Sequence, residues 1–251
     1  MSSSPIIEAA DPVAFVAARQ RARETFKFLW RELSWEYRRI VPALDMSAVQ
    51  VTFACKNLLP GAPTVEHLWI NDIGFDGDTV TGTLINQPEW VSSVAEGDAV
   101  CVPLEDITDW IYACAGQAYG AHTVNVLRAN MTEAQRREHD AAWGVDFGDP
   151  AEVRVSPYHA AHERPIPEHP MSLNVAERIE EALLADPTLV TSTDASGHSM
   201  LHREALAGNL TPVRMLIKAG ADPRVLDTKG RLPVDLARKM GWDDVVELLS
   251  H

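Results

Sequence analysis

The hydrophobic pattern of the N-terminal region predicts one long amphipathic helix. Asp11 and Pro12 pair a helix-capping residue with a proline at the first helical position. Apolar residues then recur at steps of three and four, which places them on one face of a helix. We expect this helix to extend to about Arg39. The apolar set consists of Phe15, Ala18, Ala22, Phe26, Leu29, Trp30, Leu33 and Tyr37.

After the helix the pattern changes to short alternating runs, which are typical of strands. They lie around Val49 to Phe53 and in "VEHLWI", "TVTGTLI", "DAVCVPL" and "HTVNVL". The clusters "LLPGAP", "GFDGD" and "AEGD" separate several of them and are suited to joining antiparallel strands. "MTEAQRREHDAAW" predicts another helix, with Thr132 and Gln135 at capping-box spacing. The predicted fold class is α+β, with a long helix packed on an antiparallel sheet.

A proline-rich segment interrupts these patterns. Five prolines fall in "DPAEVRVSPYHAAHERPIPEHP", which begins at Asp149 and has little periodicity. Such a segment is typical of a linker or of a loop that lies over a surface. We therefore predict an α+β domain at 11–148, a connector at 149–171 and a separate C-terminal domain at 172–251.

The C-terminal region contains an internal repeat. "DASGHSMLHREALAGNLTPVRMLIKAGAD" and "DTKGRLPVDLARKMGWDDVVELLSH" align at the ~33-residue spacing of ankyrin units. "SMLH" and "AGAD" resemble motifs of the ankyrin family, whereas "LPVDLA" departs from them at the histidine position. Upstream, Asn174 and Glu177 are spaced as the capping box of a half-repeat. The resemblance implies an all-α ankyrin-repeat stack of a half-repeat cap and two repeats.

Composition limits the classes of partner and compartment. The 22 Lys and Arg residues against 36 Asp and Glu residues give a net charge of −14, which disfavours direct nucleic-acid binding and anionic membrane surfaces. The start, "MSSSPIIEAADP", has neither a basic region nor a long apolar run, and no stretch reaches the roughly 18 apolar residues of a membrane helix. We expect a cytoplasmic protein whose three cysteines are buried thiols.

Known catalytic patterns are absent from the sequence. It contains no nucleophile elbow, Walker loop, dinucleotide fingerprint or H-E-x-x-H motif, so we predict that the protein is not an enzyme and needs no cofactor. His159, His162 and His169 could bind a metal, which leaves a metal-dependent hydrolase as an alternative. Because H-x-x-H on a proline-rich loop is a weak pattern, we predict no metal site.

The distribution of charge is more informative. Between Asp45 and Ala113, eleven acidic residues stand against one cation, Lys56. Such runs are often only solvated surface, and helix cations can neutralise some of the carboxylates. The excess nevertheless predicts a negative face on a small domain, which is suited to a basic protein. Basic proteins whose cations normally hold phosphates fit this description best.

The acidic segment "LEDITDWIY" has two interpretations. Ile107, Trp110 and Ile111 follow helical spacing, which predicts a short turn pinned to the core. Glu105, Asp106 and Asp109 would then project from it toward a partner. In the other interpretation, Asp109 caps the turn and the rest is solvated surface.

An ordered series of motifs resembles the bacterial domain-of-unknown-function 2314 (DUF2314) family across residues 15–147. "EHLWINDIGFDGDTVTGTLINQPEW", "EGDAV" and "ITDWIY" follow its E-H-x-W, G-x-L-x-N-x-P, G-D and D-W-x-Y pattern. The combination with ankyrin repeats is similar to immunity proteins against nuclease effectors of the type VI secretion system. That resemblance implies tight, stoichiometric inhibition of a basic toxin by occlusion of its active site.

The predicted partner-binding residues combine the acidic set with one aromatic side chain. Trp242 lies at a helix start, where it is an anchor for docking of the repeats on the first domain, an anchor for a partner, or core of the terminal repeat. A general ankyrin-type scaffold without a toxin partner remains the main alternative function. The full predicted set is Asp72, Asp76, Asp78, Glu89, Glu96, Asp98, Glu105, Asp106, Asp109 and Trp242.

Overall fold

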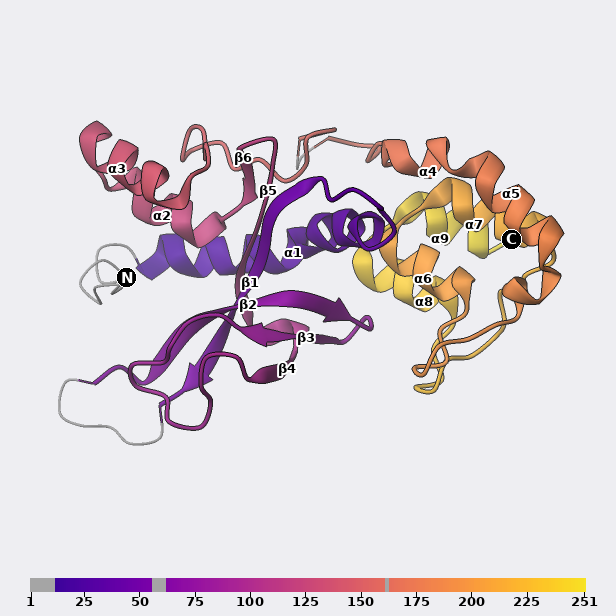
Figure 1. Ribbon diagram of the computed structural model, residues 1–251, viewed down its shortest axis with the longest axis horizontal. Coiled ribbons are helices and arrows are strands. Elements are labelled where there is room, and N and C mark those ends of the chain that lie inside the picture. Colours follow the sequence, from indigo (N-terminus) through magenta and orange to yellow (C-terminus); the bar gives the residue numbers. More distant parts are fainter. Residues whose placement is uncertain (1–11, 56–61, 161–162) are drawn as a thin grey trace. The chain divides into compact units, whose positions relative to one another are not determined.

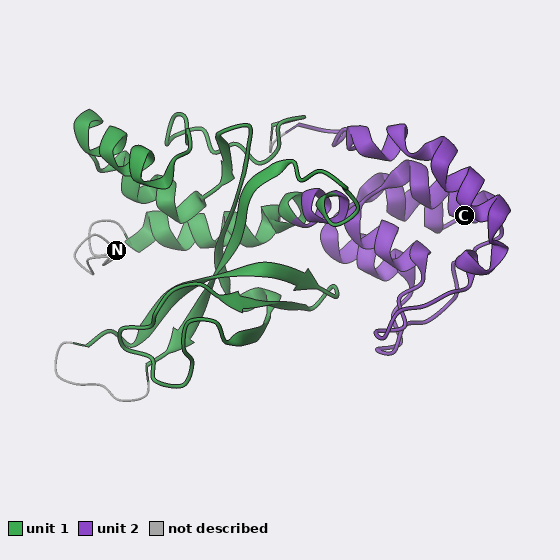
Figure 2. Ribbon diagram, viewed as in Figure 1, with its two compact units in different colours: residues 1–29, 36–162 green, residues 30–35, 163–251 purple. Residues whose placement is uncertain are grey.

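The computed structural model of the chain describes residues 12–55, 62–160 and 163–251. The chain divides into two compact units, residues 1–29 with 36–162 and residues 30–35 with 163–251 (Figure 2). We call these unit 1 and unit 2. Asp11, Lys56, His162 and most of the predicted "LLPGAP" turn lie outside the described residues. Within the part of the chain that the structure describes, no helix is both long and apolar enough to cross a membrane.

The predicted N-terminal helix is α1, Pro12–Glu36 (Figure 1). It ends a few residues before the expected Arg39, because the Glu36 carboxylate accepts hydrogen bonds from the backbone N–H groups of Ala43 and Leu44 and turns the chain. Most of the predicted apolar face is buried, including Phe26. Residues 30–35 of the helix belong to unit 2.

Unit 1 contains a six-stranded antiparallel sheet in the order β4-β3-β2-β1-β5-β6 (Figure 1). Helix α1 packs on it through a Phe26–Phe75 ring contact of 5.1 Å and a hydrogen bond from Trp110 Nε1 to the Ala22 carbonyl. The predicted class of helix plus antiparallel sheet is confirmed. The strands are β1 Leu44–Ala54, β2 Val65–Phe75, β3 Thr79–Leu84, β4 Ala99–Pro103, β5 Ile107–Cys114 and β6 Gln117–Gly120.

Two local predictions are wrong. The segment "ITDWIY" is not a helical turn but part of β5, preceded by a short 3-10 turn, η1, at Leu104–Asp106. Seven of the eight β5 residues are buried, so the strand lacks the apolar–polar alternation of a half-exposed strand. "HTVNVL" is not a strand but the start of helix α2, His122–Ala129.

Helix α3, Glu133–Trp143, begins with the predicted capping box between Thr132 and Gln135, which is confirmed. The aromatic side chain of Trp143 lies against the small core at the β5–β6 side of the sheet. This core joins α2 to the strands and to the segment after α3. Its buried members are Ala48, Ile111, Ala118, Ala121, Val124 and Phe147.

Unit 2 is helical, and its second half repeats one arrangement. Helix α4, Pro170–Asn174, is followed by α5, Ala176–Ala185, and by a 3-10 turn, η2, Pro187–Val190. The pair α6, Met200–Ala207, and α7, Leu210–Lys218, then recurs as α8, Pro233–Met240, and α9, Asp243–Leu249. Corresponding helices start at the same spacing, as the sequence repeat predicts.

The predicted capping box of Asn174 and Glu177 is wrong. Helix α5 begins after Val175, and no side chain caps it. The cap lies earlier, where Nδ1 of His169 accepts a hydrogen bond of 3.0 Å from the Met171 backbone N–H at the start of α4. The proline at the first position of α4 ends the irregular connector there.

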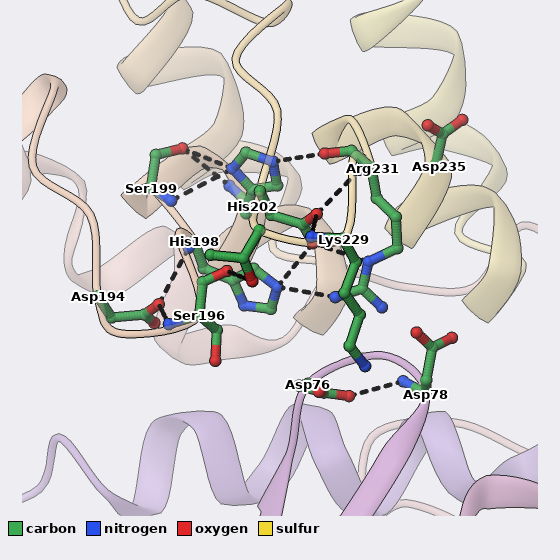
Figure 3. A network of polar contacts seen from close by, with 12 residues as sticks. Asp76, Asp78, Asp194, Ser196, His198, Ser199, His202, Lys229, Arg231 and Asp235 are labelled. Atoms are coloured by element: carbon green, nitrogen blue, oxygen red, sulfur yellow. Dashed lines mark hydrogen bonds and ion pairs between the residues drawn. The ribbon is translucent and has the colours of Figure 1, made fainter.

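Polar side chains join the two turns that precede α6 and α8 (Figure 3). Asp194 Oδ1 accepts backbone N–H groups from Ser196 and His198, and Asp227 Oδ1 accepts the corresponding groups from Lys229 and Arg231. His198 Nε2 lies 3.2 Å from Asp227 Oδ2, which connects one turn to the next. Each turn is thus built around one aspartate, and the two are hydrogen-bonded together.

Candidate partner-binding surface

The connection between β3 and β4, residues 85–98, presents an unusual combination of side chains. We call this segment the acidic loop. Trp90 and Ile85 keep 37% and 40% of their surface exposed, although both are large hydrophobic residues. Glu89, Glu96 and Asp98 are exposed around them. An exposed aromatic side chain with a charged rim is typical of an interaction site.

The acidic loop is held by Glu66, at the start of β2. Glu66 Oε1 accepts a hydrogen bond from the backbone N–H of Glu89 at 2.8 Å. Its other oxygen accepts from Trp90 at 2.9 Å and from Val91 at 3.0 Å. One carboxylate therefore satisfies three consecutive N–H groups, and the buried Val91 side chain fixes the same turn to the core.

Both ends of the loop are tied to the sheet. The Trp69 backbone N–H donates to Asn86 Oδ1 at 2.7 Å, and the Ile85 N–H donates to the Trp69 carbonyl at 2.9 Å. At the other end, the Leu84 N–H donates to the Asp98 carbonyl, and Asp98 Oδ2 accepts from the Ala95 N–H. These bonds restrict the backbone, so that the exposed side chains start from a fixed frame.

No positive charge lies on the strands beside this loop. Strands β1 to β6 contain neither lysine nor arginine, while Glu66, Glu89, Glu96 and Asp98 lie on or beside the loop. The residues that the structure describes between 44 and 120 include no lysine or arginine. The loop therefore carries a negative potential toward solvent.

The remaining predicted acidic residues fall into a second group. Asp76 and Asp78 lie in the β2–β3 turn, where the Asp78 N–H donates to Asp76 Oδ1 at 2.9 Å (Figure 3). Glu105 and Asp106 lie in the adjacent turn η1, and the N–H of Leu104 donates to the Asp78 carbonyl. The length of β3, about 20 Å at ~3.3 Å per residue, separates this group from the acidic loop.

Asp72 lies between the two groups. It occupies a bulge in β2 with φ of 52° and is exposed. A bulge leaves a residue outside the regular pairing of the sheet. The single negative face predicted from the sequence is therefore two clusters with one carboxylate between them.

Asp109 does not belong to this surface. Its side chain is fully buried, and Oδ2 accepts hydrogen bonds from the Thr123 N–H at 2.7 Å and the Thr123 hydroxyl at 2.6 Å. Oδ1 accepts from the N–H groups of Trp110 and His122, both at 2.8 Å. Burial raises the pKa of Asp109 to about 6, although these hydrogen bonds oppose the increase. The prediction that Asp109 faces a partner is wrong, because its carboxylate binds the N-terminus of α2.

The order of these features along the chain agrees with a known family. A family model described as "Uncharacterized protein conserved in bacteria (DUF2314)" matches residues 13–147. The chain belongs to the DUF2314 family. The resemblance to this family predicted from the sequence is confirmed.

Curated relatives extend this comparison. The chain is 41% identical over 233 residues to "Putative ankyrin repeat protein NMB1133/NMB1171" of Neisseria meningitidis serogroup B, which covers 93% of this chain and 91% of that protein. "Uncharacterized protein YegJ" of Escherichia coli K12 is 32% identical over 87 residues, 35% of this chain and 57% of that protein. Mouse "Protein phosphatase 1 regulatory subunit 27" is 32% identical over 73 residues, 29% and 47% of the two chains.

The motif residues of the DUF2314 region hold the acidic loop and α2 in place. Glu66 of E-H-x-W binds the loop backbone, and Asn86 of G-x-L-x-N-x-P accepts from the backbone of Trp69. Asp109 of D-W-x-Y caps α2, and Trp110 is fully buried against α1, as its predicted role as a core residue requires. In this DUF2314 protein the motifs thus build the frame rather than the exposed surface.

Trp242 lies inside unit 2 rather than on a partner-binding surface. It is only 4% exposed, and its Nε1 donates to the Leu206 carbonyl at 3.1 Å. The Arg31 guanidinium lies 4.9 Å from the ring, a cation–π arrangement. At the equivalent position of the preceding helix pair, Asn209 accepts a hydrogen bond from Trp35 Nε1. The core interpretation of Trp242 is therefore correct, and the partner-anchor interpretation is wrong.

Two of the three connector histidines lie in the described residues, and each contacts a side chain of its own unit. His159, in unit 1, packs against Phe28 with ring centroids 4.7 Å apart. His169, in unit 2, lies 3.0 Å from the Glu32 carboxylate, while His162 is outside the described residues. Across 12–55, 62–160 and 163–251, no group of three or more His, Cys, Asp or Glu side chains is placed to hold a metal.

The sequence interpretation missed the apolar part of the surface. Trp90 stands in "LINQPEWVSS", among turn-forming and polar residues and outside any periodic pattern, whereas Ile85 is the last residue of the predicted strand run "TVTGTLI". A tryptophan without a periodic apolar neighbour is a signal for an exposed aromatic side chain. Counting carboxylates alone could not separate the acidic loop from the second cluster.

Proposed function

We propose that this protein acts by binding a basic protein through the acidic loop of unit 1, without catalysing a reaction. The main support for this proposal is that the Glu66 carboxylate fixes the backbone of the loop. The fixed loop exposes two large hydrophobic side chains, Trp90 and Ile85, among the carboxylates of Glu89, Glu96 and Asp98. A fixed loop loses little conformational freedom on binding. The aromatic side chain supplies contact area, and the carboxylates supply charge.

The two components have different kinetic roles. Carboxylates on an uncompensated surface increase the rate of encounter with a cationic partner, and salt screens this effect. A large apolar side chain that becomes buried in the complex mainly slows dissociation. Binding should therefore show a salt-dependent association rate and a dissociation rate that depends on Trp90.

The partner class that fits best is a basic toxin, and the finer proposal is an immunity protein against a nuclease effector of the type VI secretion system. The active site of a nuclease is rich in cationic side chains because it binds phosphate groups. A rigid acidic loop matches such a site in charge and would inhibit the toxin by occupying it. The resemblance of the domain combination to such immunity proteins supports this proposal.

We propose that unit 2 is a short ankyrin-repeat stack. Its helix pairs recur at one spacing, with aspartate-centred turns at matching positions. The name of the Neisseria meningitidis relative and the sequence motifs "SMLH" and "AGAD" support the assignment. Ankyrin stacks bind proteins, so a scaffold in which unit 2 makes the main contact is the second candidate function.

A retention experiment with the full chain tests both candidates. Immobilised wild type is compared with the double variant Glu89→Gln/Glu96→Gln and with the control Glu177→Gln/Glu181→Gln, which removes two exposed charges from α5 of unit 2. We expect a basic protein to be retained from host lysate by wild type and control and lost by the loop variant. Retention by the loop variant together with loss by the control supports the scaffold.

The kinetic arm uses the retained protein after purification. Association rates measured across a salt series should fall in the Glu89→Gln/Glu96→Gln variant and depend less on salt. Trp90→Ala should increase the dissociation rate at an unchanged melting temperature. If no basic protein is retained, or if the loop variant associates like wild type, the proposed role of the acidic loop is wrong.

A further inference from the structure

Unit 1 contains a groove that is separate from the acidic loop. Its volume is about 470 Å³, and helices α1 and α2 each contribute one face to it. From α1 come three alanines and Arg21 at helical spacing, and from α2 come His122 and Asn125 on the face that continues to Ala129. Pro150, Ala151 and Val153 form a third side. Small side chains on both helices leave this space open.

His122 provides a hydrogen-bond acceptor at the groove. The residue is only 6% exposed, and its Nε2 lies 2.8 Å from the Thr25 hydroxyl. That hydroxyl donates its single proton to the Arg21 carbonyl at 2.6 Å, so it accepts from Nε2–H. Burial and then the charge of Arg21 lower the pKa of His122 to about 4, which keeps the imidazole neutral at pH 7. Its Nδ1 therefore carries a lone pair.

Asn125 provides hydrogen-bond donors beside it. The residue is 3% exposed, and its Oδ1 accepts a hydrogen bond of 2.6 Å from Arg128. This bond orients the amide, which leaves the two N–H groups of Nδ2 as donors. Among the described residues, neither His122 Nδ1 nor Asn125 Nδ2 has a hydrogen-bond partner, and neither is sealed from solvent.

The charges around the groove favour an anionic group at one position. Arg21 is the charged residue of the lining, and no carboxylate lines the groove. The N-terminal N–H groups of α2 are unavailable, because Asp109 already accepts those of His122 and Thr123. An anion entering the groove would therefore be held by Arg21 and by Asn125 Nδ2 rather than by the helix terminus.

We propose that the groove binds the carboxyl-terminal residue of a peptide with a small apolar side chain. The terminal carboxylate would accept hydrogen bonds from Arg21 and from Asn125 Nδ2. The amide N–H of the same residue would donate to His122 Nδ1. The alanine and valine lining provides apolar contact for a small side chain. This site is independent of the acidic loop, because it uses other residues and the opposite charge.

The test uses the purified full chain with N-acetyl-Ala-Ala as the probe and its carboxamide as the matched ligand. Binding is followed by titration and by the ¹⁵N resonance of His122 Nδ1, which shifts when that nitrogen accepts a hydrogen bond. We expect saturable binding of the carboxylate and at least about tenfold weaker binding of the carboxamide, which corresponds to ~1.4 kcal/mol. Equal affinities, or the absence of saturable binding, would overturn the proposal.

Two variants locate the binding site. Ala17→Leu fills the groove from an exposed position of α1, whereas Val16→Leu, on a neighbouring exposed position outside the lining, is its control. We expect the first to abolish binding and the second to leave it unchanged. Arg21→Gln should weaken binding of the carboxylate ligand and leave binding of the carboxamide ligand unchanged. Unaltered binding in Ala17→Leu, with its melting temperature retained, would place the peptide elsewhere and overturn the assignment.

Discussion

A 2.9 Å hydrogen bond joins the Trp90 backbone N–H to the Glu66 carboxylate, so a β2 side chain sets the position of the exposed tryptophan. Glu66→Ala removes the carboxylate that accepts hydrogen bonds from three consecutive N–H groups. We expect it to lower the free energy of unfolding by about 1–3 kcal/mol. Amide hydrogen exchange at residues 89–91 should also become faster. Both effects can be measured by denaturant unfolding and exchange mass spectrometry.

Glu89→Ala is the matched control for this change. It removes an exposed carboxylate of the same type, and surface changes of this kind usually alter stability by within about 0.5 kcal/mol. We expect normal exchange protection at 90 and 91, because the Glu66 bonds to those groups persist. Equal exchange in the two variants would show that Glu66 does not restrain the loop.

From the raised pKa of the buried Asp109 we predict a specific dependence of stability on pH. Its pKa in the folded state is about 6, above the ordinary 3.8, so the folded protein binds this proton more tightly than the unfolded chain. The group therefore makes the protein less stable as pH rises from about 4 to 6. From the size of the shift the change is about 3 kcal/mol. Asp109→Asn removes this titration.

The asparagine variant should be less stable than wild type, because its amide nitrogen faces backbone donors of α2. Its deficit should be larger at pH 4.5 than at pH 7, since only the wild type gains stability as Asp109 takes up a proton. Other carboxylates titrate in both proteins and cancel in the difference. Urea unfolding of both proteins across this pH range measures the deficit, and a deficit that shrinks on acidification contradicts the assignment.

Local sequence patterns were sufficient to predict α1 and the spacing of the unit 2 helices, since both follow from residues that recur at regular intervals along the chain. They failed at "ITDWIY" and "HTVNVL", where contacts distant in sequence decide the structure. Strand β5 is buried on both faces, so it shows no alternation. Helix α2 begins where Asp109, on a separate strand, binds its first N–H groups. Neither relationship can be derived from periodicity.

The candidate surface was predicted only in its charge. Exposed Glu89, Glu96 and Asp98 were named from the excess of carboxylates, and Asp109 was included because charge alone does not indicate burial. A carboxylate beside a buried tryptophan on a strand can be a buried cap, and only the position of α2 decides this. Trp90 was missed because its exposure depends on the Glu66 bonds to the loop backbone.

Gly208 limits the space beside Trp242. A Cβ atom at Gly208 would lie 2.3 Å from Cδ2 of the indole, and the backbone has φ of 71°, which already disfavours a side chain. Gly208→Ala should therefore lower the free energy of unfolding by about 1–3 kcal/mol more than the strain of a left-handed alanine alone would. Thermal and urea unfolding of the variant measure this cost.

The comparison for that variant is Gly220→Ala. Gly220 has φ of 91° but no atom within 4 Å of the added Cβ, so it carries the backbone cost without the collision. We expect Gly208→Ala to be clearly the less stable of the two. Equal stabilities would mean that Trp242 moves freely, which would contradict its placement as a core side chain of unit 2.

Asp227 and Asp194 occupy equivalent turns, and their substitutions should differ in effect. Asp227 accepts N–H groups from Lys229 and Arg231 and is also bonded to the Arg231 side chain at 2.7 Å. Burial favours protonation of Asp227, but the Arg231 and Lys229 hydrogen bonds outweigh it and lower the pKa to about 2. Asp194 is exposed and accepts only backbone groups.

Asp227→Asn should lower the free energy of unfolding at pH 7 by about 1–3 kcal/mol, and Asp194→Asn by less than about 1 kcal/mol. A carboxyl with a lowered folded pKa contributes stability that is present above about pH 4 and is lost as pH falls through 2. The stability deficit of Asp227→Asn should therefore narrow on acidification below pH 4, because the Asp227 carboxylate of the unfolded wild-type chain takes up a proton there while that of the folded protein stays largely ionised. Urea unfolding at pH 7 and pH 3 distinguishes the two aspartates. A deficit independent of pH would mean that the Asp227 charge does not stabilise unit 2, and that the hydrogen bonds to neutral groups suffice.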